Sequence, residues 1–280
     1  MSKLKKKSKK IKVVKRKIKH IRFGVAGRPL EKLKTGVVGL DALFDRGIPE
    51  SSSILIEGGP GSGKTILCLQ IAYNMCKMGK RCLYMSFEEP EERLREHMRD
   101  FGWEPTPFEK QGLLKIQRFS ALDIARSVEA LLSEAKKELL IGIEPVLIPH
   151  DFKPDFVLID SLTSIASAFS GEESRFRIYI EQLFRYLERS DITTFLIRET
   201  SNPTHLGTTF TEKSEAISFL SDGIISLYNA IYPMGKRLSA IEVVKMRGEG
   251  FKRKIVRMEI DHRGITIYPN QTLPPGYKLT

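Results

Sequence analysis

The stretch at residues 53–65 constrains the fold of this chain more than any other feature of its sequence. It reads Ser53-Ile-Leu-Ile-Glu-Gly-Gly-Pro-Gly-Ser-Gly-Lys-Thr65. Gly58, four further residues and then Gly63-Lys64-Thr65 match the pattern of a phosphate-binding loop. The apolar run at residues 54–56 supplies the strand that precedes such a loop, and a helix-like run at residues 66–78 follows at once. The stretch therefore predicts an α/β fold with a nucleotide at the tip of its first core strand.

Each part of this loop has a chemical task. The glycines let successive backbone N–H groups curl around an anion, and the helix that follows adds the positive end of its dipole. Lys64 is expected to reach the β- and γ-phosphates of ATP, and the Thr65 hydroxyl to ligate Mg²⁺. The alternative is a turn that merely joins strand to helix, but the flanking elements favour nucleotide binding. The residues predicted to bind the nucleotide are Gly58, Gly59, Pro60, Gly61, Ser62, Gly63, Lys64 and Thr65.

Two glutamates follow the next predicted strand, at residues 81–87. Glu88 and Glu89 precede Pro90, which suits the first turn of a predicted helix at residues 91–101. Because the carboxyl ends of parallel strands lie on one edge of a sheet, both acids should face the phosphate loop. One carboxylate there can orient and deprotonate the water that attacks the γ-phosphate. The alternative is that both acids only enrich the first turn of a helix.

A further acid ends the apolar strand Phe156-Val-Leu-Ile-Asp160. Four apolar residues and an aspartate are a weak pattern alone. Downstream of a phosphate loop, they are typical of the strand whose carboxylate supports the Mg²⁺ shell. We therefore predict that Thr65 and Asp160 hold the metal.

The rest of the chain predicts a mostly parallel, twisted sheet flanked by helices, with antiparallel strands in the C-terminal part. Lys245 and Arg247 lie two apart on a late strand and so share a face, where they could clasp an anion or sit in water. The polar residues 199–213 could form a functional loop at the active edge, or a solvated one. The other expected elements are strands at residues 113–119, 193–198, 223–228, 238–246, 254–260 and 264–268, and helices at residues 121–139 and 175–188.

Positive charge is concentrated at the N-terminus. Residues 1–22 contain twelve Lys and Arg and no acid, so they carry the whole formal charge of +12. Like-charge repulsion should keep this tail disordered when free. It could grip DNA or RNA, bind anionic lipid or an acidic partner, or only solubilise the chain. We divide the chain into this tail, a linker at residues 23–32, one domain at residues 33–270 and a C-terminal tail at residues 271–280.

The sequence offers no support for membrane insertion or for metal binding by cysteine. It contains no run of eighteen apolar residues, and its basic N-terminus lacks the apolar block of a secretory signal. Cys68, Cys76 and Cys82 show no metal-ligand spacing and are expected as small buried residues in a reducing compartment. The expected location is the cytoplasm.

Taken together, these motifs resemble the KaiC branch of the RecA superfamily. The resemblance runs in one ordered series from about residue 33 to residue 269 and covers one such domain. It implies a RecA-like core, a hexameric ring and ATP bound between subunits. Besides the phosphate loop it is carried by Thr35-Gly36, Gly39-Leu40-Asp41, Gly47-Ile-Pro49, Phe87-Glu88-Glu89, Ile159-Asp160-Ser161, Ser221-Asp222-Gly223 and Lys245-Met-Arg247-Gly248.

The resemblance also implies roles for single residues. Glu88 and Glu89 match the family's catalytic carboxylate pair. Lys245 and Arg247 match residues that reach into the neighbouring subunit's nucleotide site and touch the γ-phosphate. Phe251 stands near the place of a histidine that family members often have.

The resemblance supports autophosphorylation less well than it supports ATP hydrolysis. Clock KaiC phosphorylates itself on an adjacent Ser and Thr, and the matching positions here are Ser218 and Phe219. One of the two acceptor hydroxyls is therefore missing.

Three functions follow from the sequence as hypotheses. The first is an ATPase that uses Mg²⁺ and works at the subunit interfaces of a homo-oligomeric ring. The second is a nucleic-acid-binding accessory protein, in which ATP sets assembly and the basic tail grips phosphates. The third is a switch that binds ATP, turns over little and signals to a protein partner.

Overall fold

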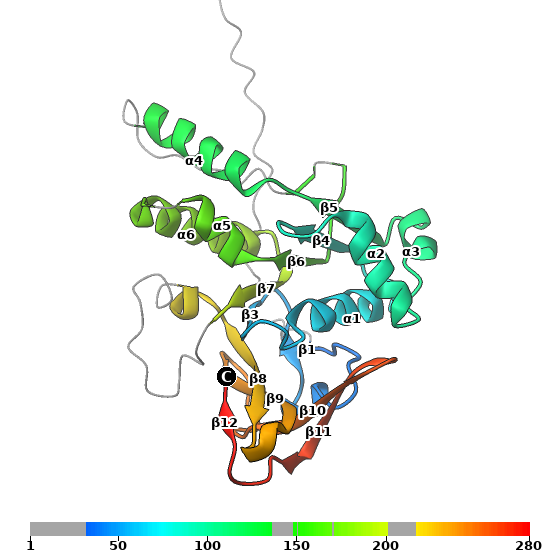
Figure 1. Ribbon diagram of the computed structural model, residues 1–280. Coiled ribbons are helices and arrows are strands. Elements are labelled where there is room, and N and C mark those ends of the chain that lie inside the picture. Colours follow the sequence, from blue (N-terminus) through cyan, green and yellow to red (C-terminus); the bar gives the residue numbers. More distant parts are fainter. Residues whose placement is uncertain (1–31, 136–147, 150, 170, 201–216) are drawn as a thin grey trace, which may run out of the picture.

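A mixed sheet forms the body of the chain in the computed structural model, which describes residues 32–135, 148–149, 151–169, 171–200 and 217–280 (Figure 1). Its strands run in the order β11-β10-β9-β8-β3-β7-β6-β4-β5. The strands from β8 to β5 pair in parallel, whereas β9, β10 and β11 are added antiparallel at the far side of β8. This topology confirms the predicted mostly parallel sheet with antiparallel C-terminal strands.

The strands begin and end close to the residues expected from the apolar runs. The inner parallel strands are buried along almost their whole length because helices cover both of their faces, whereas β5, at the edge, alternates. A separate antiparallel ribbon, β1 (Lys32–Leu33) with β2 (Ile48–Pro49), precedes the sheet. The sheet strands are β3 (Ser53–Gly58), β4 (Cys82–Ser86), β5 (Leu114–Arg118), β6 (Phe156–Asp160), β7 (Thr193–Glu199), β8 (Gly223–Ile231), β9 (Arg237–Met246), β10 (Val256–Asp261), β11 (Gly264–Thr272) and β12 (Lys278–Leu279).

Helices pack on both faces of the sheet because side chains alternate along each strand. On β3, Ile54 and Ile56 join the apolar cluster under α1 and α2, whereas Leu55 joins the cluster under α4, α5 and α6. The helices are α1 (Lys64–Lys77), α2 (Glu91–Asp100), α3 (Thr106–Lys110), α4 (Ala121–Ala135), α5 (Leu162–Ala168) and α6 (Glu173–Arg189), with short 3₁₀ turns η1 (Asp41–Leu43) and η2 (Pro233–Gly235).

The last residues of the chain pack against the sheet. β12 pairs antiparallel with β8, and Thr280 exchanges two backbone hydrogen bonds with Asn229. Leu273, Tyr277 and Leu279 lie in one apolar cluster with residues of β8 and β9. Part of the segment expected as a C-terminal tail therefore belongs to the packed body, because its apolar side chains cover the antiparallel strands.

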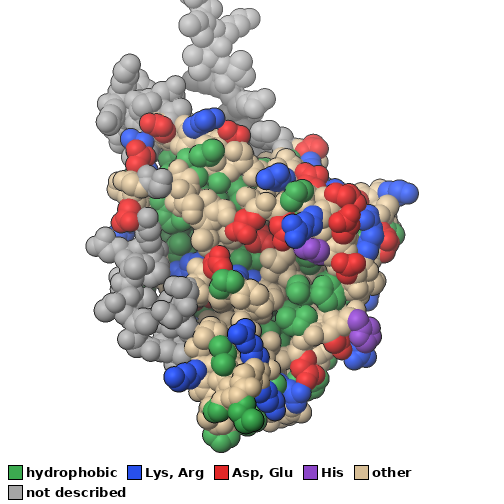
Figure 2. All heavy atoms as spheres, viewed as in Figure 1, with side chains coloured by type: hydrophobic (Ala, Val, Ile, Leu, Met, Phe, Trp, Pro, Cys, Tyr) green, Lys and Arg blue, Asp and Glu red, His purple; other side chains and the backbone are tan. Residues whose placement is uncertain are grey.

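On the face shown in Figure 2, acidic and basic side chains are interspersed, most densely over α2. This agrees with a body that is formally neutral outside residues 1–22. All three cysteines are buried and free, as expected. Among the described residues, no helix is long and apolar enough to cross a membrane. The basic tail and residues 201–213 of the polar loop lie outside the described residues.

Candidate active site

The phosphate loop joins β3 to α1 in a conformation that requires glycine. Gly63 precedes the helix with a φ of 97°, in the left-handed region that favours glycine. A Cβ on Gly63 would also lie 2.7 Å from Cδ1 of Ile260 on β10. Gly61 is exposed and has a φ of 69°, and a Cβ there would meet no atom within 4 Å. The loop is thus packed against β10 at Gly63 and open to solvent at Gly61. Of its other residues, Gly58, Gly59 and Ser62 are buried and Pro60 is exposed.

The side chain of Lys64 folds back over this loop. Its Nζ donates hydrogen bonds to the carbonyl oxygens of Gly58 at 2.9 Å and Gly59 at 2.8 Å. Burial lowers the pKa of Lys64, and nearby carboxylates oppose the shift, Glu199 most strongly. The ammonium group therefore lies at the mouth of the loop, surrounded by acceptors.

Asp160 receives two hydroxyl groups from different elements. Thr65 Oγ1 on α1 and the Tyr84 hydroxyl on β4 each donate to Oδ2 of Asp160 at 2.8 Å. Burial raises the pKa of Asp160, while both hydrogen bonds act to lower it. The predicted metal pair, Thr65 at the start of α1 and Asp160 at the end of β6, is thus in direct contact.

Glu88 and Glu89 have different partners although both follow β4. Oε1 of Glu88 accepts hydrogen bonds from the hydroxyls of Ser161 and Ser164, each at 2.6 Å. The carboxylate of Glu89 instead forms an ion pair with Nε of Arg93 on α2, at 3.2 Å. Both glutamates lie near enough to Asp160 to raise its pKa. Glu88 also acts on the pKa of Lys64, whereas Glu89 is ion-paired with α2.

Several residues of this edge escape sequence reasoning. Tyr84 reads as one more apolar residue of a buried strand, and Ser164 as a helix residue. Glu199 ends β7 in register with Gly58 and lies near enough to Lys64 to act on its pKa. Only the rule that parallel strand ends share one edge could have singled out Glu199.

Lys245 and Arg247 do not join this cluster within one chain. Nζ of Lys245 donates to the carbonyl oxygens of Ser218 at 2.8 Å and Ser221 at 2.5 Å. Arg247 donates from Nη2 to the carbonyl oxygen of Phe219 at 2.6 Å. Burial lowers the pKa of Lys245, and the charge of Arg247 adds to the shift.

Strand register explains this separation. Lys245 pairs with Ile224, at the start of β8, and the start of β8 lies beside the start of β3. The phosphate loop leaves β3 at its other end, after Gly58, which pairs with Leu227. The three steps from Ile224 to Leu227 span roughly 10 Å along a strand. The two cations therefore lie near the opposite ends of the strands from the chain's own loop.

The donors at this edge fit Mg²⁺ and a triphosphate. No described group of three or more His, Cys, Asp and Glu side chains could hold a metal by itself. Mg²⁺ does not need such a group, because it is held by one or two carboxylates together with substrate phosphates and water. Asp160 and Thr65, in contact with each other beside the phosphate loop, offer oxygen ligands of this kind.

Comparisons with known proteins agree with one another. A family model described as "ATPase: KaiC" matches residues 33–272. A UPF0273 protein of Thermotoga maritima is 30% identical over 86% of this chain and 98% of its own length. The circadian clock oscillator protein KaiC of Parathermosynechococcus lividus is 29% identical over 84% of this chain and 40% of its own length. The crystal structure of a KaiC-like protein from Pyrococcus horikoshii OT3 superimposes with a TM-score of 0.68 and 26% identity, over 86% of this chain and 100% of that one. The matched lengths correspond to a single KaiC-like domain with a RecA fold.

Proposed function

The chain belongs to the KaiC ATPase family, and from this premise we propose that it binds Mg²⁺-ATP at its phosphate loop and hydrolyses it. One observation carries the proposal: three elements meet at one sheet edge. Thr65 of α1 lies 2.8 Å from Asp160 of β6, and Glu88, beyond β4, accepts the hydroxyl of Ser161 next to Asp160. A metal-binding pair and a candidate base beside a phosphate loop are the parts that phosphoryl transfer to water requires.

Lys64 and the loop would hold the triphosphate. The Lys64 ammonium group, which contacts two neutral carbonyls, would turn to the β- and γ-phosphates, because hydrogen bonds to charged acceptors are stronger. The backbone N–H groups at the start of α1 would add to this binding. A bound Mg²⁺ supplies charge neutralisation on the phosphates, with Thr65 and Asp160 as its protein ligands.

Glu88 is the better candidate for the general base. Two hydroxyls fix its carboxylate at the edge that carries Lys64 and Asp160, so it can accept a proton from a water lined up on the γ-phosphate. Glu89 is paired with a guanidinium on α2 and would support the turn instead. The sequence pattern alone left this choice open.

Lys245 and Arg247 would act on the nucleotide of a neighbouring subunit. In their own chain they lie near the opposite ends of the strands from the loop, which supports a role in trans. Cations that arrive from a neighbour stabilise the charge of the transferring phosphoryl group only after assembly. We therefore include a homo-oligomeric ring, of the hexameric kind, in the proposal.

Mixing two inactive variants tests this arrangement. Lys64→Ala should lose its own nucleotide site but keep Lys245 and Arg247. Arg247→Ala should keep its nucleotide site but lose one of the two cations. Each should release no phosphate alone, and the mixture should regain activity because Lys64→Ala subunits supply Arg247 to intact sites. Size-exclusion chromatography in Mg²⁺-ATP serves as the control that both variants assemble. A mixture that assembles and stays inactive would contradict the role in trans.

A nucleic-acid-associated role is the second candidate. The concentration of twelve Lys and Arg without any acid in residues 1–22 favours it, since such a segment binds phosphate backbones by charge. This role would add to ATP hydrolysis rather than replace it. Charge alone would give the tail no sequence readout.

A further inference from the structure

A buried ion pair lies one residue before the phosphate loop. Glu57 on β3 and Arg198 on β7 are register partners, and their side chains are only 2% and 7% exposed. Nη2 of Arg198 donates a hydrogen bond to Oε1 of Glu57. Burial lowers the pKa of Arg198, and the charge of Glu57 opposes that shift. Two charges are therefore enclosed in the fold directly beside Gly58.

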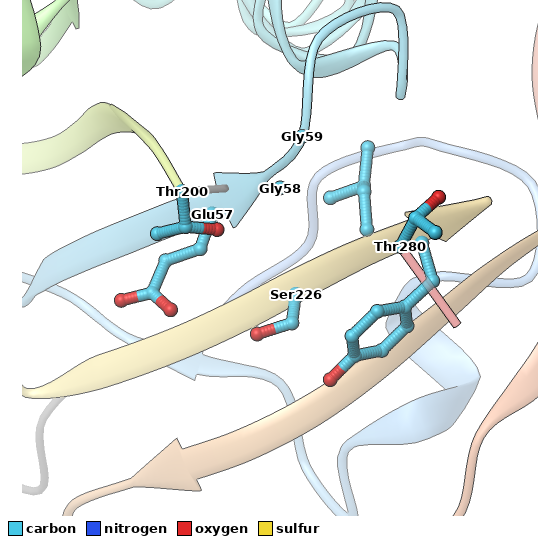
Figure 3. Close-up of a pocket in the computed structure, with 8 residues that line it drawn as sticks. Glu57, Gly58, Gly59, Thr200, Ser226 and Thr280 are labelled. Carbon is cyan, nitrogen blue, oxygen red and sulfur yellow. The ribbon is translucent and has the colours of Figure 1, made fainter. Parts of the chain in front are cut away.

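The surroundings of this pair are tightly packed. Figure 3 shows Glu57 and Ser226 on neighbouring strands beside Gly58 and Gly59. The hollow that these residues line together with Thr200 has no room for a water molecule. No water-sized space therefore lies beside Glu57 in this hollow.

Arg198 extends the contact to the segment that holds the two cations. Its Nη2 also donates to Oγ of Ser218 at 3.1 Å. The carbonyl oxygen of Ser218 accepts a hydrogen bond from Nζ of Lys245 at 2.8 Å. The next carbonyl, that of Phe219, accepts from Arg247 at 2.6 Å. A continuous set of contacts thus runs from the phosphate-loop strand to both cations.

A buried ion pair is not explained well by stability, because a protein with apolar residues of similar volume in its place is often equally stable or more stable. Arginine offers something else: several donors in one rigid plane. One guanidinium can therefore hold Glu57 and Ser218 at the same time. This geometry fixes the 217–220 helical turn against β3.

We propose that Arg198 is a positioning residue for the cations that act in trans. Clamped by Glu57, it fixes Ser218 and through it the place of Lys245 and Arg247. The inference rests on the proposed function, in which these cations serve a neighbouring subunit's nucleotide. A subunit that lacks the Glu57–Arg198 pair should therefore have an intact nucleotide site but misplaced Lys245 and Arg247.

Paired substitutions test the clamp without leaving a lone buried charge. The double variant Glu57→Gln with Arg198→Met should bind Mg²⁺-ATP as the parent does, while its kcat falls at least about tenfold, because small misplacements at a reacting centre have effects of this order. Ser218→Ala keeps the ion pair and removes only one hydroxyl, and it should lower kcat with KM unchanged. The matched control is Arg177→Met with Glu181→Gln, an exposed pair on α6, which should leave kcat unchanged.

Mixing experiments show whether the double variant is impaired in its nucleotide site or in its cations. When it is mixed with Lys64→Ala, it should regain phosphate release, because Lys64→Ala subunits supply correctly placed Lys245 and Arg247 to its intact nucleotide sites. If the double variant does not fold, Ser218→Ala carries the test in the same mixture. Normal kcat in both variants would overturn the proposal.

The mixture of Lys64→Ala with Arg247→Ala is the reference that distinguishes failure of the positioning role of Arg198 from failure of the action in trans. If the reference is active and the double-variant mixture is not, the role of Arg198 is structural and this inference alone fails. If neither mixture is active, the action in trans fails, and the inference falls with the proposed function.

Discussion

Glu88 and Glu89 follow each other in the chain, but their carboxylates have different partners. Glu88 accepts two hydroxyl groups from the start of α5, whereas Glu89 pairs with a guanidinium on α2. The two residues should therefore respond differently to the same substitution.

Glu88→Gln should lower kcat at least about 100-fold, because a positioned base contributes 10²–10⁴-fold to such reactions. Glu89→Gln keeps that base and should stay within about tenfold of the parent. Both should still bind Mg²⁺-ATP. Steady-state phosphate release measures kcat, and a nucleotide titration provides the control. Equal losses in both variants would contradict the separate roles.

Motif spacing was sufficient to predict that Lys64, Thr65 and Asp160 meet at one sheet edge, and the structure brings them there. The same spacing could not reveal the partner of Asp160 on β4. Tyr84 looks like any apolar residue of a buried strand until the pairing of β4 with β6 is known. Contacts that depend on strand order are not local in sequence.

At the scale of elements, the start of α1 depends on a glycine that has two separate reasons to be there. Gly63 has a φ of 97°, and a Cβ would lie 2.7 Å from Cδ1 of Ile260. Gly59 in the same loop has no such constraint, since the nearest atom to its Cβ would lie 3.7 Å away.

Gly63→Ala should therefore reduce stability by about 1–3 kcal/mol, the usual range for a side chain forced into a sparsely populated backbone region. It should also weaken Mg²⁺-ATP binding, because the loop must shift. Gly59→Ala is the matched control and should fold as the parent does. Urea unfolding and nucleotide titration check both effects. Equal stability of the two variants would show that the loop tolerates a Cβ at Gly63.

The turn after β9 is fastened to the N-terminal ribbon. The buried carboxylate of Glu249 contacts Nζ of Lys32 at 2.6 Å and Nε of Arg46 at 3.3 Å. Its hydrogen bond with Lys32 holds the pKa of Glu249 below the ordinary value, and Arg46 adds to this. A carboxylate with a lowered pKa in the folded state stabilises the fold above its unfolded pKa and loses that effect as the pH falls.

Glu249→Gln should therefore be less stable than the parent at pH 7, and the difference should shrink as the pH falls below about 4.3, the ordinary pKa of glutamate. Urea midpoints measured at several pH values test this. Glu181→Gln, on the exposed surface of α6, is the control and should change the midpoint little. A difference that stays constant from pH 7 to pH 3 would exclude the linkage.

Apolar periodicity predicted most elements, because buried strands and amphipathic helices repeat with fixed periods. It did not predict the pairing of Lys278 and Leu279 with β8, since two residues are too few for a period. It also could not predict the Glu249 contacts, which join residues about two hundred positions apart.

In the whole molecule, the phosphate loop follows β3 and the two cations lie at the end of β9, near the opposite ends of the strands. The proposed active unit is therefore larger than one chain. The second proposed contact between molecules is made by residues 1–22, which contain twelve Lys and Arg and no acid.

Deleting residues 1–22 should abolish retardation of DNA or RNA by the full chain while leaving ATP hydrolysis unchanged. Binding by the full chain should weaken steeply with salt, because neutralised phosphates release counterions. A gel-shift titration at several salt concentrations measures both effects. Binding that survives the deletion would remove the tail from the account.

Phosphate release by the chain in Mg²⁺-ATP, compared with Lys64→Ala under the same conditions, tests whether ATP is bound and hydrolysed at the phosphate loop. We expect steady turnover by the parent and none by the variant, because the loop lysine holds the phosphates that react. A parent that binds Mg²⁺-ATP without releasing phosphate would contradict hydrolysis and favour the switch. A parent that binds no nucleotide would contradict the site itself.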